Sequence, residues 1–68
     1  MDINIGNIVK IKGDYSDFTD HLDGQTLEVI ATPEEPGDFD LNDDTIICRC
    51  QLGSDWYIYK RNVTEVVA

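Results

Sequence analysis

Positive charge is what this sequence has least of. Its 68 residues include only 5 lysines and arginines against 14 aspartates and glutamates, so the formal net charge is -9. A charge of this sign and size repels nucleic acid phosphates and anionic membrane surfaces, and it attracts basic partners. We therefore expect neither nucleic acid nor a membrane as partner, and we expect a basic protein surface instead.

Long apolar runs are also missing. No stretch is long enough to cross a bilayer. The first residues, MDINIGNIVKIKGD, lack the basic region and the apolar segment of a signal peptide. These absences predict a cytoplasmic protein. The hydrophobic fraction of 41% is nevertheless too high for a disordered acidic tail, so the chain should fold.

Groups that usually carry catalysis or bind transition metals are scarce. The one histidine, His21, lies beside Asp20 in a charged segment with no nucleophile motif, which predicts an ordinary surface histidine and no enzyme. Cys48 and Cys50 occupy alternate positions of an expected strand, where their side chains do not converge as a disulfide requires. We expect two reduced core thiols and no cofactor. The alternative, a zinc site, needs two further ligands, and His21 is distant in sequence.

One acidic run has the spacing of a calcium loop at its start. Residues 38–44, DFDLNDD, place oxygen ligands at alternate positions, as an EF-hand loop does. Asp43 then stands where the loop needs glycine, and Arg49 stands where it needs a bidentate glutamate. The run is therefore interpreted as a solvated loop without a metal site, with weak calcium binding as the alternative.

Alternating apolar residues predict short strands within a single domain that spans residues 1–68. The expected strands cover residues 7–13, 25–31, 45–52 and 56–61, with a turn and a short closing strand in 62–67. In the fourth strand Trp56 shares one face with Ile58, and Tyr57 shares the other with Tyr59. The residues expected to face the core in the first three strands are Val9, Ile11, Leu27, Val29, Ala31, Ile46, Cys48, Cys50 and Leu52. Ile30 and Ile47 are expected to point outward.

Two long acidic loops separate the first three strands. Residues 14–24 carry an aspartate at every third position, and Tyr15, Phe18 and Leu22 are expected to hold this loop against the body. Residues 32–44 contain both prolines and six acidic residues, so they form a loop rather than a strand. Residues 53–55, GSD, predict a tight hairpin turn between the third and fourth strands.

This order of elements resembles an SH3-like barrel. The shared features are the long loops after the first two strands, the tight hairpin and the single turn before the last strand. The segment GNIVKIKGDYSDFTDHLDGQTLEVIA is also similar to a KOW motif. Its matching residues are Gly6, Val9, Ile11, Gly13, Gly24, Leu27 and Val29. The resemblance implies an all-β, small five-stranded, partly open barrel.

The chain departs from the binding residues of both families. RNA-binding KOW units usually carry lysine or arginine in the loop after the first strand, where this chain has aspartates. Peptide-binding SH3 domains have a tryptophan that opens the third strand, where this chain has Asp44 and Thr45. Trp56 opens the fourth strand instead. The resemblance therefore implies a fold, without RNA or polyproline binding.

Two functions remain as hypotheses. The first is a small acidic protein-interaction module, of a kind that suits phage or mobile elements, with a nucleic acid mimic as its extreme form. Its predicted contact residues are Asp14, Asp17, Asp20, Asp38, Asp40, Asp43 and Asp44. The alternative is a nucleic-acid-binding barrel. That barrel would use Lys10, Lys12, Arg49, Lys60 and Arg61. We expect a monomer, or a weak dimer formed through an open edge strand.

Overall fold

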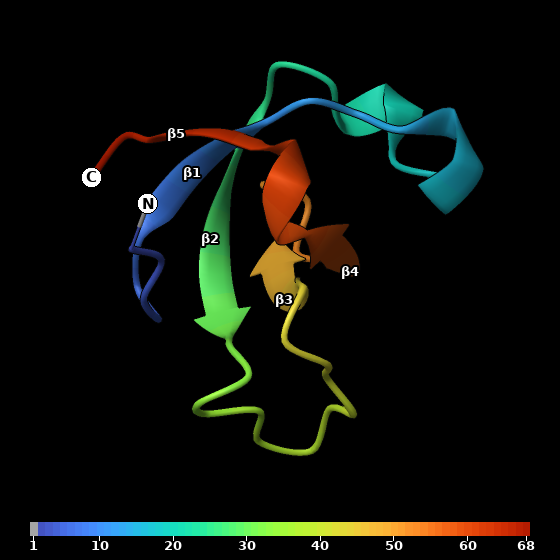
Figure 1. Ribbon diagram of the computed structural model, residues 1–68. Coiled ribbons are helices and arrows are strands. Elements are labelled where there is room, and N and C mark those ends of the chain that lie inside the picture. The colour runs from blue at the N-terminus through green and yellow to red at the C-terminus, as the bar shows by residue number, and fades with distance from the viewer. Residues whose placement is uncertain (1) are drawn as a thin grey trace.

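Five short strands make up most of the protein (Figure 1), and the computed structural model describes residues 2–68. The strands are β1 (Ile8–Ile11), β2 (Thr26–Ala31), β3 (Thr45–Arg49), β4 (Asp55–Tyr59) and β5 (Val63–Val66). Three 3-10 turns join them, η1 (Tyr15–Asp17), η2 (Asp20–Leu22) and η3 (Lys60–Asn62). No helix in this part of the chain is long and apolar enough to span a membrane.

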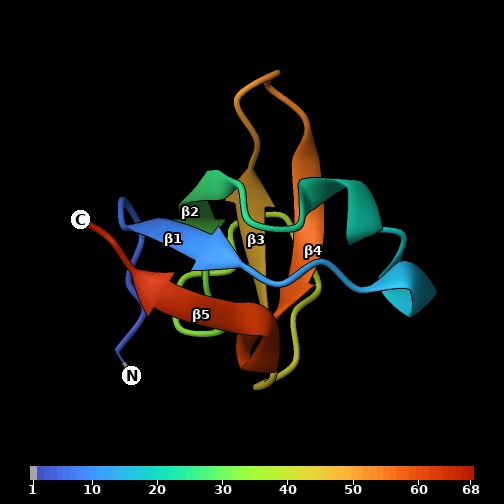
Figure 2. The same ribbon diagram turned by 90° about the horizontal axis from the view of Figure 1, so that it is seen from above.

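All five strands belong to one antiparallel sheet in the order β4-β3-β2-β1-β5. Figure 2 shows β1 and β5 running across the direction of β3 and β4, so the sheet bends strongly. Strand β2 pairs with both halves, and its register with β3 shifts between Val29 and Ala31, which is where a bulge allows a bend. The prediction of five antiparallel strands with a short turn before the last one is confirmed. Hydrogen bonds do not close the sheet into a barrel, because β4 and β5 remain its two edges.

The core lies on the concave face of this bent sheet. The inward positions predicted for β1 and β2, and for Ile46, Cys48 and Cys50, are all buried. Leu22, Ile58 and Val63 complete the core, and Ile3, Trp56 and Val66 pack against it. Alternate residues of a strand point to opposite faces, which is why the pattern in the sequence predicted this core well.

Two positions of the third strand were predicted wrongly. Leu52 is 95% exposed, because β3 ends at Arg49 and the chain turns at once, with the N–H of Gly53 donating to the carbonyl of Cys50. Ile47 was expected outward but is only 1% exposed. Its cross-strand partners are Tyr57 and the buried Ala31, and Phe39 of the second loop packs against the Tyr57 ring, so side chains surround Ile47 on this face.

Hydrogen bonds to polar side chains hold the first acidic loop in shape. Asp14 caps η1 by accepting from the N–H of Ser16 at 3.0 Å, and Asp23 accepts from the N–H of Gly13 at 2.8 Å. The buried Thr19 hydroxyl accepts from the N–H of Asp14 at 3.0 Å. Leu22 is buried, as predicted.

The two aromatic residues of this loop do not hold it against the body as predicted. Tyr15 is 80% exposed and Phe18 is 76% exposed. The polar contacts already close the loop, so the aromatic side chains are left in solvent.

Gly13 fixes how closely this loop approaches the first strand. A Cβ on Gly13 would lie 2.5 Å from the carbonyl oxygen of Thr19 and 2.8 Å from Cα of Asp20. Gly13→Ala should therefore lower the free energy of unfolding by about 2–3 kcal/mol, the upper range for forcing extra atoms into a packed site. Urea denaturation measures this change.

Gly37→Ala is the matched control for that substitution. Gly37 has a φ of +59° with nothing within 4 Å of its Cβ position, so only backbone strain of about 1 kcal/mol is expected. An equal decrease in the free energy of unfolding for the two variants would contradict the close approach at Gly13.

Candidate functional site

Aromatic side chains from separate segments border a groove on the outer face of β4. The groove has a volume of about 360 Å³. Its lining residues, called the tyrosine groove below, are Ser16, Asp17, Phe18, Thr45, Tyr57 and Tyr59. Tyr57 is 54% exposed, and Phe39 from the second acidic loop packs edge-on against its ring with centroids 6.3 Å apart. Exposed aromatic rings gathered in a groove are typical of a contact surface.

The local backbone explains how Phe18 and Tyr57 reach the same place. Tyr57 and Tyr59 alternate with the core residue Ile58, so they point away from the core. Phe18 ends η1 in the left-handed conformation, with φ of 59°, at the tip of the first loop. The tip thereby forms one wall of the groove, and the outward side of β4 forms the other.

Asp17 supplies the charge in the tyrosine groove. Its Oδ2 atom is buried and has no hydrogen-bond partner among the described residues. Burial and the neighbouring charge of Asp14 raise the pKa of Asp17, while Arg61 acts in the opposite direction. A side-chain hydrogen bond with Asp14 also raises the pKa of Asp17, so the finding of a missing donor applies to its Oδ2 atom.

Asp14 is in the opposite situation. Its Oδ1 accepts from both the N–H and the hydroxyl of Ser16, at 3.0 and 2.7 Å. These hydrogen bonds lower the pKa of Asp14. Its carboxylate is consequently engaged within its own loop, whereas the Oδ2 atom of Asp17 has no partner among the described residues.

The structure does not bring the seven predicted aspartates into one surface. Figure 1 shows the two acidic loops leaving different ends of the sheet, with residues 14–24 near the top and 32–44 at the bottom. Asp20 is exposed beside His21, whose ring stacks edge-on against Trp56 at 4.8 Å. Trp56 and Tyr57 are adjacent in β4, so Asp20 belongs to the other side of that strand.

The second loop contributes four exposed aspartates, Asp38, Asp40, Asp43 and Asp44. Asp44 lines a smaller hollow of about 220 Å³, which it shares with Tyr59, Lys60 and Arg61. Asp17 is thus the one predicted contact residue that lines the tyrosine groove.

The five basic residues are dispersed, and most have local partners. Arg49 forms an ion pair with Asp55, with Nε 2.8 Å from Oδ1, and this hydrogen bond raises the pKa of Arg49. Arg61 lies over the ring of Tyr59, 4.1 Å from its centroid. Lys10 lies opposite Glu65 on β5. Lys12 is exposed beyond the end of β1, and Lys60 faces a separate hollow.

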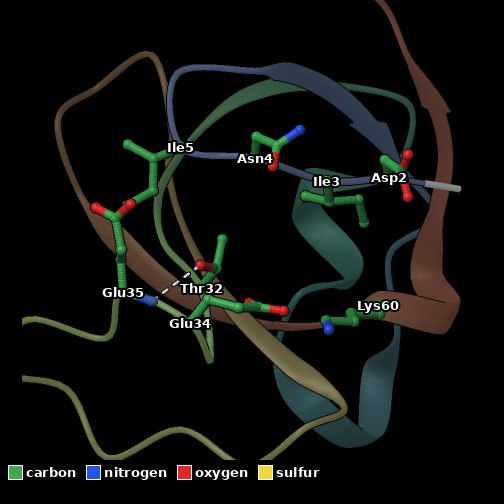
Figure 3. A pocket seen from close by; sticks show the side chains of 8 residues that line it. All are labelled: Asp2, Ile3, Asn4, Ile5, Thr32, Glu34, Glu35 and Lys60. Atoms are coloured by element: carbon green, nitrogen blue, oxygen red, sulfur yellow. Dashed lines mark hydrogen bonds between the residues drawn. The ribbon is translucent and has the colours of Figure 1, made fainter.

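That separate hollow is polar and has a volume of about 470 Å³. It lies between the N-terminal segment and the turn at Thr32, where the N–H of Glu35 donates to the Thr32 hydroxyl at 3.3 Å. Figure 3 shows the side chains of Asp2 and Glu35 at opposite ends of this hollow, with that of Glu34 directed toward Lys60. The carboxylates do not converge, and residues 2–68 contain no group of three metal-binding side chains.

The two cysteines are buried and unbridged, as predicted, but their chemistry differs. Burial raises the pKa of Cys48 to about 12. Burial is the largest single influence on Cys50 and acts in the same direction. Hydrogen bonds from the N–H groups of Ser54 and Leu52 and from the side chains of Trp56 and Ser54 together outweigh it and lower the pKa of Cys50. Cys50 also borders a shallow surface hollow with Thr26 and Gln51. This difference was not predicted from the sequence, because residues 50–52, where the turn begins, were assigned to the third strand.

Comparisons with family models, curated proteins and solved structures found no match to this chain.

Asp17 and Asp14 should affect stability in opposite directions. The pKa of Asp17 is raised above 3.8, so its ionised form is disfavoured by folding, and Asp17→Asn should raise the melting temperature at neutral pH. This gain should disappear as the pH falls through the raised pKa, where wild-type Asp17 takes up a proton. Thermal denaturation followed by circular dichroism across this pH range measures both effects.

Asp14→Asn is the control of opposite sign. The pKa of Asp14 is lowered below 3.8, so its stabilising effect is complete above that pH and is lost at lower pH. The substitution should lower the melting temperature at neutral pH. A decrease for both variants would show that Asp17 is satisfied in a way its geometry does not indicate.

The two thiols should react at different rates in the folded protein. Iodoacetamide attacks the thiolate, so Cys50 should be alkylated first, at a pH where Cys48 remains protonated and enclosed. Mass spectrometry of Cys50→Ser and Cys48→Ser variants measures each thiol separately. Both should react alike in denaturant, and equal rates in the native state would refute the difference.

Proposed function

We propose that this protein is an interaction module that binds a basic segment of another protein in the tyrosine groove. The observation that carries the proposal is the pairing of exposed aromatic rings with Asp17, a carboxylate whose buried oxygen lacks a donor. We also propose that the fold is an SH3-like barrel. The strand order β4-β3-β2-β1-β5, the bend at β2 and the turn η3 before β5 support an SH3-like barrel, with a KOW-like unit formed by β1, the first loop and β2.

The chemistry of the groove favours lysine or arginine. A guanidinium or ammonium group binds over the face of a tyrosine ring and gives a charge-assisted hydrogen bond to a carboxylate. Tyr59 already holds such a group on one side, because Arg61 lies 4.1 Å from its centroid. A second cation from a partner would meet Tyr57 and Asp17 in the same way.

The remaining aspartates act at longer range in this proposal. Asp38, Asp40, Asp43 and Asp44 are exposed in the second loop, and the net charge is -9. Such a field accelerates the encounter with a basic partner and repels acidic ones. A nucleic acid mimic is the extreme form of the same idea, in which this field replaces that of a phosphate backbone.

The positions of the basic residues speak against the nucleic-acid-binding alternative. Arg49 is already neutralised by its ion pair with Asp55, so it would have to give up that contact to bind a phosphate. We therefore do not propose nucleic acid as a ligand, and nothing in the groove suggests an enzyme.

A short fluorescent peptide in which arginine alternates with threonine tests the proposal. Fluorescence anisotropy should detect binding that weakens as salt is raised. Tyr57→Ala and Asp17→Asn should each weaken binding about tenfold, which corresponds to about 1.4 kcal/mol. Two controls lie in the same loop as Asp17, namely Tyr15→Ala and Asp20→Asn. They remove the same groups from outside the groove and should change the affinity by less than about twofold.

The outcomes separate the groove from simple charge attraction. Equal losses for Asp17→Asn and Asp20→Asn would mean that only the net charge matters, and the groove would be abandoned. Replacement of the four aspartates of the second loop by asparagine should slow association and leave dissociation nearly unchanged. If fluorescently labelled single-stranded DNA binds the protein in the absence of the peptide, the nucleic acid alternative is correct instead.

A further inference from the structure

One edge of the sheet is open beside the tyrosine groove. Strand β4 ends the strand order and pairs with β3 alone. At the two ends of this pairing the N–H of Cys50 donates to Ser54 and that of Lys60 donates to Asp44, each at 2.8 Å. Hydrogen-bonded and non-hydrogen-bonded pairs alternate along an antiparallel ladder. These two bonds therefore fix which residues of β4 direct their backbone N–H and C=O groups toward β3.

The remaining residues of β4 therefore turn their backbone groups away from the sheet. They are Asp55, Tyr57 and Tyr59, which form the non-hydrogen-bonded pairs with β3. Among residues 2–68, no backbone hydrogen bond outside the sheet involves their N–H groups or the carbonyls of Asp55 and Tyr57. A strand edge of this kind is a ready template for pairing with another chain.

The edge of β4 lacks the features that usually prevent such pairing. It contains no proline and no lysine, and its register with β3 runs without a bulge from Tyr59 to Asp55. The opposite edge, β5, is different. Its pairing with β1 shifts register between Lys10 and Ile11, and such an irregularity bends the strand and disrupts a template.

The open edge and the tyrosine groove share the same residues. Tyr57 and Tyr59 turn their backbone N–H groups to the free edge and their side chains into the groove. Any strand added to β4 would place alternate side chains on this outer face, over the two rings and toward Asp17. The lining residues Asp17 and Phe18 lie on the far wall of the groove.

We infer that the partner binds as an added β-strand on the edge of β4, with basic side chains at alternate positions directed into the tyrosine groove. This inference rests on the proposed function. Charge complementarity selects the occupant, because a net charge of -9 and the unpartnered Asp17 oxygen both favour a positively charged strand. The backbone bonds supply affinity for any extended chain, and the alternating cations supply selectivity.

A second copy of this chain is disfavoured as the occupant. Two copies would each bring a net charge of -9 to the interface, and like charges oppose their approach. Light scattering at low salt should therefore find a monomer. A dimer under those conditions, dissociated by substitutions in β4, would overturn the inference in favour of self-pairing.

Two N-methylated forms of the arginine–threonine peptide test how it binds. One carries a methyl group on every arginine backbone nitrogen, and the other on every threonine backbone nitrogen. Alternate residues of a strand direct their N–H groups to opposite edges, so only one of the two sets can face β4. One methylated peptide should lose about tenfold or more in affinity, while the other keeps the affinity of the parent. Loss with methylated arginine indicates an antiparallel strand, and loss with methylated threonine indicates a parallel one.

Amide hydrogen exchange gives a second readout from the protein itself. On peptide binding, the N–H groups of Tyr57 and Tyr59 should exchange much more slowly, whereas that of Ile58, already bonded to β3, should change little.

The outcomes separate this inference from the function on which it rests. If the parent peptide does not bind, both fail. If it binds but the two methylated forms bind equally well, strand addition is wrong and the interaction in the groove stands.

Discussion

The structure depends on enclosing a small core with one bent sheet. Val9, Val29, Ile46 and Cys48 are completely buried, although the chain has only five short strands to cover them. Strand β2 makes this possible, because it pairs with β1 on one side and β3 on the other and bends at a register shift between them. Since the core takes alternate residues, the other residues of β4 are left on the outer face of the sheet. They include Tyr57 and Tyr59, so the surface proposed for binding follows from the same alternation that builds the core.

The acidic residues divide into those that support the fold and those that do not. Asp14 and Asp23 accept backbone N–H groups within the first loop, and Asp55 holds Arg49. Asp17 accepts no backbone N–H group in this way, and its raised pKa means that folding disfavours its ionised form. A group kept in an unfavourable setting is a reasonable candidate for function.

Sequence alone predicted the strands and most of the core, because alternation is a local property of a strand. It failed where the outcome depends on distant segments. Leu52 continues the alternating pattern but lies in an exposed turn. Ile47 is on the outer side of β3 and is nevertheless buried, because side chains from other segments surround it. The groove was missed for the same reason. Phe18 and Tyr57 meet only after the first loop has folded back along β4, and no spacing in the sequence records that meeting.

An open strand edge and a high net charge serve complementary roles in the proposed binding mode. Backbone hydrogen bonds at an edge accept any extended chain, so the edge by itself cannot select a partner and exposes the protein to self-association. The charge of -9 adds the missing discrimination, because it opposes a second copy and favours a cationic strand. Sequence-independent bonds and a strong field therefore make a selective surface from very few residues. A chain with so thin a core has little room for a deep pocket, and an edge beside a shallow groove suits it better.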